Sequence, residues 1–445
     1  MERMVSRAKL NFDWIWLGFI VGLAYLLTGF LIGPRVPAER QLGACVTNIN
    51  LPGPFGVGLN CDSPELMWLA REPSGLLTKN SYRQSRPGLI IAAAILQVPL
   101  SLVVPFGAPP QKIGWGDVEG INKLFKINLP TYLAYVLLNI GILIASFFIL
   151  RRVMEREHDR RAIHSASALL IVSTGLLLVA NDVTKAFVWS PHMQMFNILV
   201  PVLSLYVTLR LLRGGLFDRS FVLGIGLTVG LGLTAYAFFV VVTACAIPLA
   251  IWTTIKERRR RGRAATHLTA LIVLSVVPSL LWYAYVRTTT GAFFHAEMAD
   301  GELVWMTEDW AKGIGYFVHE WFGSLREQLG FMAPQTIPLA ALIVWIAIFA
   351  LRHRTALRGA GHLWPIVPAG LYVSIAVLGF YTCIGWGAPR LAYPPIPPLI
   401  AAAGAVALVL NQQLPTTERR ELPAGFLIIA LVQMVVVVVK EGPWS

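Results

Sequence analysis

The segment 129-LPTYLAYVLLNIGILIASFFIL-150 runs for 22 residues without a charged side chain. An α-helix rises about 1.5 Å per residue, so a run of this length crosses the roughly 30 Å apolar core of a bilayer. Eight further apolar runs have the same character: 14–33, 163–180, 193–209, 267–286, 337–351, 363–383, 391–410 and 422–439. Together these runs predict an all-α polytopic membrane protein.

The composition of the whole chain agrees with membrane spans. Of its 445 residues, 56% are apolar and 14% are charged, whereas a soluble protein has about 25% charged residues. The apolar content excludes a disordered chain, and four cysteines are too few for a disulfide-dense scaffold. The sequence contains no nucleic-acid-binding motif, so we interpret the net charge of +13 as a topology signal.

Basic clusters between the apolar runs predict the topology. They lie at 3–9, 151–161, 210–219, 256–263, 352–358 and 419–420. Short basic loops face the cytoplasm, and all six do so only if the run 88–107 makes no crossing and the run 221–252 crosses twice. The second run then turns at its glycines, Gly224, Gly226, Gly230 and Gly232. This predicts a single domain of residues 1–445 with about 11 crossings, a cytoplasmic N-terminus and an extracytoplasmic C-terminus.

Two long segments, 34–128 and 288–336, are left as extracytoplasmic loops. Each contains an apolar stripe with helical spacing, formed by Val118, Ile121, Leu124 and Phe125 in the first and by Trp310, Ile314, Phe317, Trp321 and Leu325 in the second. Aromatic residues at this density suit the headgroup region. We expect two interfacial helices over the outer mouth of the bundle, although simple anchoring would give the same pattern.

The first loop also contains Cys45 and Cys61. An extracytoplasmic location is oxidising in many cells, which favours a disulfide between them over two free thiols. Such a bond would close about 15 residues and contribute roughly 3 kcal/mol in the chain-entropy model.

The stretch 61-CDSPELMWLAR-71, followed by 81-SYRQSRP-87, places carboxylates and arginines on one loop. A carboxylate at the outer rim, Asp62 or Glu65, could take a proton from a hydroxyl group. Arg83 and Arg86 could bind a phosphate, because guanidinium matches phosphate oxygens with two parallel hydrogen bonds. The structural alternative is a capping box, in which Asp62 caps a helix and Glu65 reaches back to it.

Six more candidates lie at the predicted outer ends of later spans: Asp182, Lys185, His192, Arg287, Arg390 and Tyr393. Asp182 and Lys185 are three residues apart at a helix end, on the same side of the membrane as Asp62. Solvated loop charges and snorkelling side chains are the alternatives for these residues. The histidines show no zinc-ligand spacing, and no phosphate-binding loop or nucleophile elbow is present.

These features resemble the GT-C superfamily of polytopic membrane glycosyltransferases. The shared pattern is a first span, a long outer loop opening with acidic residues, a Tyr/Arg/Pro element (Tyr82, Arg83, Arg86 and Pro87) and a non-crossing apolar segment. The stretch 390-RLAYP-394 and the glycine-rich hairpin are similar to other parts of those enzymes. On this resemblance we expect a multi-pass protein of a bacterial inner (plasma) membrane.

The resemblance implies transfer of a sugar from a polyprenyl phosphate to an acceptor hydroxyl on the extracytoplasmic face. The acceptor would be a glycan, a lipid or a protein. Asp62, with Glu65, would be the catalytic base or a metal-linked carboxylate, since some members use a divalent metal ion and others do not. The cations expected to hold the lipid phosphate are Lys185, Arg83, Arg86, Arg390 and Arg287, and the other expected pocket residues are Asp182, His192, Tyr82 and Tyr393.

A transporter or flippase for a lipid-linked or small polar substrate is the second hypothesis. Transporters often show internal repeats and ionisable residues near the middle of the bilayer. This sequence shows no convincing repeat, and its spans are almost free of charge. The candidate charges lie at one rim, which favours chemistry at the membrane surface. A scaffold without catalytic activity is the third hypothesis.

Overall fold

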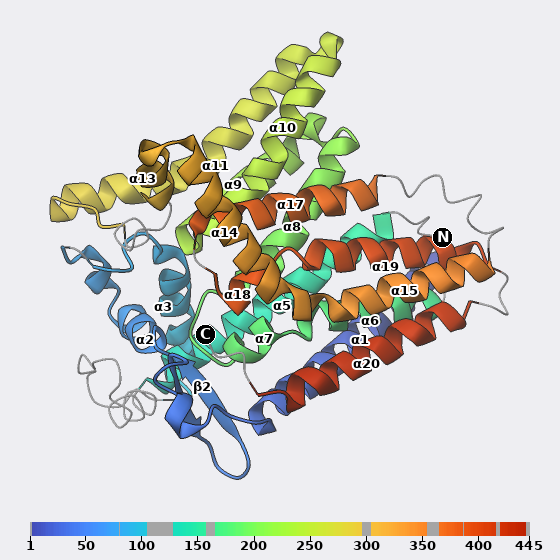
Figure 1. Ribbon diagram of the computed structural model, residues 1–445, viewed down its shortest axis with the longest axis horizontal. Coiled ribbons are helices and arrows are strands. Elements are labelled where there is room, and N and C mark those ends of the chain that lie inside the picture. The colour runs from blue at the N-terminus through green and yellow to red at the C-terminus, as the bar shows by residue number, and fades with distance from the viewer. Residues whose placement is uncertain are drawn as a thin grey trace.

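The computed structural model is a bundle of long helices with a small group of loop elements gathered at one end (Figure 1). It describes residues 2–79, 81–104, 128–156, 165–295, 304–353, 365–385, 387–414 and 419–441. The helices are α1 (Glu2–Ile32), α2 (Ser63–Arg71), α3 (Pro87–Ser101), α5 (Leu129–Arg156), α6 (Ser165–Val179), α7 (Asp182–Phe187), α8 (Phe196–Leu212), α9 (Arg219–Ala235), α10 (Val240–Lys256), α11 (Arg261–Thr290), α13 (Val304–Lys312), α14 (Ile314–Met332), α15 (Ile337–Arg352), α17 (Ile366–Ile384), α18 (Pro389–Ala392), α19 (Pro397–Gln412) and α20 (Glu421–Val439).

The helices have the length and composition of membrane spans. Within the described ranges, eight helical segments are long and apolar enough to cross a bilayer, and the four shorter apolar helices are α3, α6, α8 and α9. Many large apolar side chains on their outer faces are exposed, as expected where lipid replaces water around the bundle. The chain is therefore an α-helical integral membrane protein, while the number of crossings and their orientation stay predictions.

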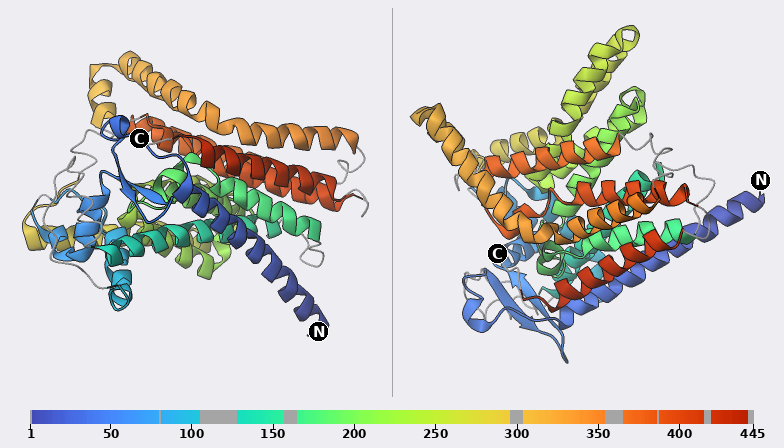
Figure 2. Two further views of the ribbon diagram at one scale, coloured as in Figure 1. Left: turned by 90° about the horizontal axis from the view of Figure 1, so that it is seen from below. Right: turned by 45° about the vertical axis from the view of Figure 1, so that its right-hand side comes forward.

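The two ends of the chain lie at opposite ends of the bundle (Figure 1). The β1–β2 hairpin, α2, α7, α18 and the last turn of α20 lie together at one end, which we call the loop end. The N-terminus of α1 points away from it, and α1 and α20 run side by side (Figure 2). One large apolar core, built from buried residues of α1, α5, α6, α8, α17 and α19, joins the helices.

The run 221–252 forms two helices, as expected, but they do not meet at the glycines. The break between α9 and α10 lies at Tyr236–Phe239, so the prediction of a turn at Gly224–Gly232 is wrong. Gly226 and Gly230, four residues apart, face α11. A Cβ at Gly226 would lie 2.8 Å from the Cβ of Leu274, and one at Gly230 would overlap the carbonyl oxygen of Leu274. These glycines allow close helix packing rather than a turn.

The first loop contains a β-hairpin that an all-α prediction misses. Strands β1 (Val46–Asn50) and β2 (Gly56–Asn60) pair antiparallel, with Val46 opposite Asn60. The predicted disulfide between Cys45 and Cys61 closes the base of the hairpin and is confirmed. A small separate core, made of Ile49, Val57, Leu59, Met67, Tyr132 and Val136, packs the hairpin against α2 and the start of α5. The interfacial helix predicted at 118–125 lies outside the described residues.

The second predicted interfacial helix is two helices. The stripe from Trp310 to Leu325 is interrupted at Gly313, whose φ of +122° is a conformation that only glycine adopts readily. The aromatic residues of the stripe meet across this break, since the Phe317 ring lies 5.4 Å from that of Trp310. Beyond α14, a short 3-10 turn at Ala333–Thr336 leads into α15.

Candidate functional site

Asp62 lies at the loop end, directly after β2 and the disulfide. Its backbone N–H donates to Oδ1 of Asn60 at 3.0 Å, and the N–H of Asn60 donates to the hydroxyl of Ser190 at 2.9 Å. The hydroxyls of Ser63 and Ser190 are 2.8 Å apart. The two buried hydrogen bonds to Ser190 attach the start of α2 to the segment between α7 and α8, so residues 130 positions apart share one site.

The carboxylate of Asp62 joins two side chains from different segments. Its Oδ1 lies 2.7 Å from Nη2 of Arg83, and its Oδ2 lies 3.2 Å from Nε2 of His192. Arg83 also contacts Glu65, with 3.0 Å between Nε and Oε2. The Arg83 side chain is 6% exposed, whereas those of Asp62 and Glu65 are 37% and 38% exposed. The cluster is therefore a buried guanidinium beneath two carboxylates that reach solvent.

The capping-box alternative for Asp62 and Glu65 is wrong. Asp62 occupies the N-cap position of α2, but its side chain accepts no hydrogen bond from the first turn. Both of its oxygens are engaged by Arg83 and His192, and the carboxylate of Glu65 turns to Arg83 instead of the cap. Pro64, which lacks an N–H, reduces the number of first-turn donors that need a partner.

Electrostatics keep this cluster ionised. Burial by itself raises the pKa of Asp62, but the hydrogen bond with His192 and the charges of Arg83 and Arg390 outweigh it and hold that pKa well below its usual value. Burial by itself lowers the pKa of Arg83, yet Asp62 and Glu65 raise it overall. Asp62 is therefore a carboxylate, and Arg83 a cation, throughout the physiological pH range.

His192 is fully enclosed and neutral. Burial lowers the pKa of His192 below its usual value, although the hydrogen bond to Asp62 acts in the opposite direction. Since Asp62 is ionised and needs a donor, the proton of the neutral ring lies on Nε2. The other nitrogen, Nδ1, has no hydrogen-bond partner within the described structure. The ring also contacts Phe187, with centroids 4.9 Å apart.

Arg86 and Arg390 bring further positive charge to the same end. Nη1 of Arg86 lies 3.1 Å from the sulfur of Met193, the residue after His192, and its guanidinium lies 5.8 Å from the ring centre of Tyr236. Arg390 is the second residue of the short helix α18, and its charge lowers the pKa of both Asp62 and His192. The cluster thus receives charge from the first loop and from Arg390, which lies more than 300 residues later in the chain.

Tyr82 supports the cluster from the side. Its ring lies 4.7 Å from the guanidinium carbon of Arg83 and contacts Phe294 at 6.3 Å between ring centres. Gln84 anchors the same segment, because its carbonyl accepts from the Trp282 indole at 2.7 Å and its side chain accepts from the Phe294 N–H at 2.9 Å. Gln84 is a supporting residue that the sequence reasoning missed.

Asn139 is a second missed residue. Its amide group donates to three carbonyls, those of Phe187, Val188 and Ser190, at 2.9 to 3.2 Å. It thereby holds the segment that carries Ser190 and His192 against α5. The signal was available, since Asn139 is a polar residue in the middle of the uncharged run 129–150 and such residues have specific partners in membranes.

Arg287 does not join the cluster of Asp62, Glu65 and Arg83. Its guanidinium donates to the hydroxyl of Tyr283 on the same helix, and Arg287 is exposed while Tyr283 is half-buried. In the described part of the chain it makes no contact with Asp62, Glu65 or Arg83, so the structure does not bring it to the cluster.

Lys185, Asp182 and Tyr393 form a second group at the loop end. The Lys185 ammonium donates to the carbonyls of Val438, at 3.1 Å, and Lys440. The Lys440 ammonium lies 2.7 Å from Asp182, and the Tyr393 hydroxyl donates to Leu178 at 2.9 Å. Burial lowers the pKa of Lys185 to about 8. The predicted phosphate ligand Lys185 therefore holds the end of α20 through these two carbonyls.

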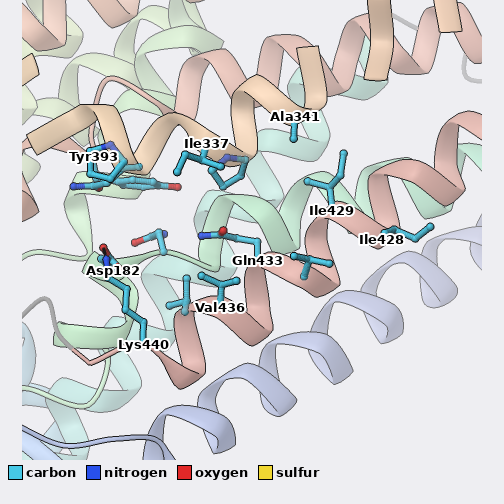
Figure 3. Close-up of a pocket in the computed structure, with 15 residues that line it drawn as sticks. Asp182, Ile337, Ala341, Tyr393, Ile428, Ile429, Gln433, Val436 and Lys440 are labelled. Carbon is cyan, nitrogen blue, oxygen red and sulfur yellow. Dashed lines mark hydrogen bonds and ion pairs between the residues drawn. The ribbon is translucent and has the colours of Figure 1, made fainter. Parts of the chain in front are cut away.

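This second group borders a pocket of about 280 Å³ between α15 and α20 (Figure 3). Asp182, Tyr393 and Lys440 lie at one end of the pocket, and apolar side chains of the two helices form its walls. Among the described residues, no three His, Cys, Asp or Glu side chains are grouped to hold a metal ion. The carboxylates of Asp62 and Glu65 are already paired with Arg83, so they do not form a ready metal site.

No protein-family model, curated protein or solved structure matches the chain. Functional conclusions therefore depend on the geometry of the two groups of side chains at the loop end.

Proposed function

We propose that the protein is a membrane glycosyltransferase that moves a sugar from a polyprenyl-phosphate donor to an acceptor hydroxyl on the extracytoplasmic face. The observation that carries this proposal is the meeting of an ionised carboxylate, Asp62, with Arg83, His192 and the charge of Arg390 at one end of the bundle. A lipid carrier presents its sugar and phosphate at that depth, where the hydrocarbon ends. The GT-C-like order of spans and loops supports the same function.

The residues have complementary roles in such a reaction. The acceptor oxygen attacks the anomeric carbon while the bond from that carbon to the phosphate oxygen breaks. The phosphate leaves with the bonding electron pair, and Arg86 and Arg390 stabilise its growing charge. The proton of the acceptor hydroxyl passes to the exposed side of Asp62. His192 and Arg83 hold that carboxylate in place from beneath.

Donor binding makes Asp62 a better base. A carboxylate with a strongly lowered pKa accepts protons poorly. The donor phosphate is an anion, so beside Arg390 it offsets part of the positive charge that depresses the pKa of Asp62. The pKa then rises toward its usual value only when donor is present. The base is thus activated when its substrate arrives, which limits loss of the donor to water.

The test is a transfer assay with the variant Asp62→Asn. The protein is incubated in nanodiscs with polyprenyl-phosphate hexoses and pentoses and a membrane extract as acceptor, and released polyprenyl phosphate is measured by mass spectrometry. Loss of a general base lowers the rate by roughly 10²–10⁴-fold. The matched control is Asp218→Asn, because Asp218 also pairs with an arginine, Arg210, at 2.9 Å and is 40% exposed.

Two results would refute the proposal. One is release of polyprenyl phosphate at the same rate by Asp62→Asn and by the wild type. The other is flux of a lipid-linked sugar across proteoliposomes with no chemical change, which would identify a transporter instead.

A further inference from the structure

The pocket between α15 and α20 is a wedge. The helices run antiparallel and touch at the end far from the loop end, where the indole N–H of Trp345 donates to the carbonyl of Leu422 at 3.3 Å. Gly425 allows this contact, since a Cβ there would overlap the Trp345 ring. Toward the loop end the helices enclose the pocket of about 280 Å³, near the lower end of the range of roughly 300–1,000 Å³ for small-molecule sites.

The walls of the wedge are apolar and open sideways. They include Ile337 from α15 and Ile428, Val432 and Val436 from α20, and all four are exposed. Both helices lie on the outside of the bundle (Figure 2). In a bilayer this opening faces hydrocarbon, so an apolar chain can enter it without crossing water.

The end of the pocket that lies at the loop end is polar, and more cations than carboxylates lie there. Asp182 accepts from Lys440 at this end (Figure 3). Gln433 donates to the carbonyl of Ala180 at 3.0 Å. Three cations, Lys185, Lys440 and Arg40, accompany two carboxylates, those of Asp182 and Glu441, and Arg40 pairs with Glu441 at 3.7 Å. The Lys440 side chain is 47% exposed, so its ammonium can accept a further anion.

The length of the wedge matches one leaflet. Ile428 lies on α20 and Lys440 is the residue that follows its last turn, twelve positions later, which corresponds to about 18 Å. One leaflet of the hydrocarbon core is roughly 15 Å thick. An amphiphile with its head at Lys440 would therefore lay a chain along the pocket at the natural depth of a membrane lipid.

We propose that this wedge is a binding site for a lipid with an anionic phosphate head group, with the phosphate at Lys440 and one chain between α15 and α20. The site is separate from the Asp62 cluster, and the proposal does not depend on the proposed glycosyl transfer. The cations at the loop end select an anionic head group, and the apolar walls of the pocket select an acyl chain.

The test compares two tryptophan variants of α20. Val432 lines the pocket and is 58% exposed, while Val435 on the same helix is 54% exposed and does not line it. Native mass spectrometry of the full chain, with added dioleoyl phosphatidylglycerol or phosphatidylcholine, counts the retained lipids. We expect the wild type and Val435→Trp to retain more phosphatidylglycerol than phosphatidylcholine. Val432→Trp should retain the two lipids equally. Lys440→Gln should weaken phosphatidylglycerol retention about fivefold and leave phosphatidylcholine unchanged.

Circular dichroism shows whether Val432→Trp keeps its helical fold. If it does not, Ala341→Phe replaces it as the pocket-filling variant, because Ala341 lines the pocket from α15. Equal retention of phosphatidylglycerol by the pocket-filling variant and Val435→Trp would overturn the proposal. So would equal retention of the two lipids by the wild type. Displacement of phosphatidylglycerol by glycerol phosphate alone would show that the site binds a free phosphate and not a lipid.

Discussion

Replacing Arg83 by methionine tests whether the acid–arginine cluster stabilises the fold. Arg83 is the hub of the cluster, since its buried guanidinium joins Asp62 at 2.7 Å and Glu65 at 3.0 Å. Methionine keeps an unbranched apolar chain but removes the charge and both ion pairs. Two carboxylates are then left beside each other without their shared cation.

The expected cost follows from the burial of each partner. Breaking a fully buried ion pair by removing one partner costs about 3–5 kcal/mol. Asp62 and Glu65 are more than a third exposed, so water solvates part of their charge and the cost falls to about 2–3 kcal/mol. Glu65→Gln removes only one of the two pairs and should cost about 1 kcal/mol.

The pH dependence adds a second observable. The pKa of Asp62 is lowered in the folded protein, so its stabilising effect is complete above the unfolded value of about 3.9 and is lost as the pH falls toward the folded value. Without Arg83 the pKa of Asp62 in the folded protein rises, so the variant loses less unfolding free energy on acidification. The difference in unfolding free energy between wild type and Arg83→Met should therefore narrow between pH 7 and pH 3.

The assay is unfolding in mixed lipid–SDS micelles, followed by tryptophan fluorescence at both pH values. The control is Arg210→Met, which breaks the more exposed pair with Asp218 and should cost no more than about 1 kcal/mol. If Arg83→Met costs no more than Arg210→Met, or if the difference does not change with pH, the cluster does not stabilise the protein by ion pairing.

Two further predictions concern the fold. Gly230→Leu forces a side chain against the backbone of Leu274 and should destabilise the protein by about 1–3 kcal/mol. Gly224→Leu meets open space and should change stability by less than about 0.5 kcal/mol. Thermal unfolding of both variants checks this, and equal effects would contradict the packing role of Gly230. The double variant Cys45→Ser/Cys61→Ser should lose roughly 3 kcal/mol, and a reductant should destabilise only the wild type; equal sensitivity of both proteins to the reductant would contradict it.

Local chemistry explains why the spans and the disulfide could be predicted. Whether 129–150 enters a bilayer depends on the summed transfer free energy of its own side chains, so no distant contact is needed. Cys45 and Cys61 are close in sequence, and their compartment favours oxidation. The loop positions of Asp62, Glu65, Arg83 and Arg86 followed from the same local reading.

Which side chains meet is a different kind of question. Asp62 had two readings from spacing, a helix cap and a site carboxylate. Its partner His192 is 130 residues away, and only the packing of the segment before α8 against α2 excludes the cap. Arg287, with a similar aromatic setting, instead stays on its own helix. Lys185 and Arg83 are both cations at the loop end, yet Lys185 donates to the end of α20 and Arg83 pairs with Glu65 of α2.

The glycines of 221–252 also show what the sequence determines and what the packing determines. The sequence by itself determined that this run is too long for one span and that it forms helices, because both depend on length and side-chain type. Only the tertiary structure decided that Gly226 and Gly230 contact α11 and that the chain turns at Tyr236. The reason is physical: membrane insertion is a sum over single residues, whereas pairing depends on the rotation and depth of helices, which the whole bundle sets through its packing.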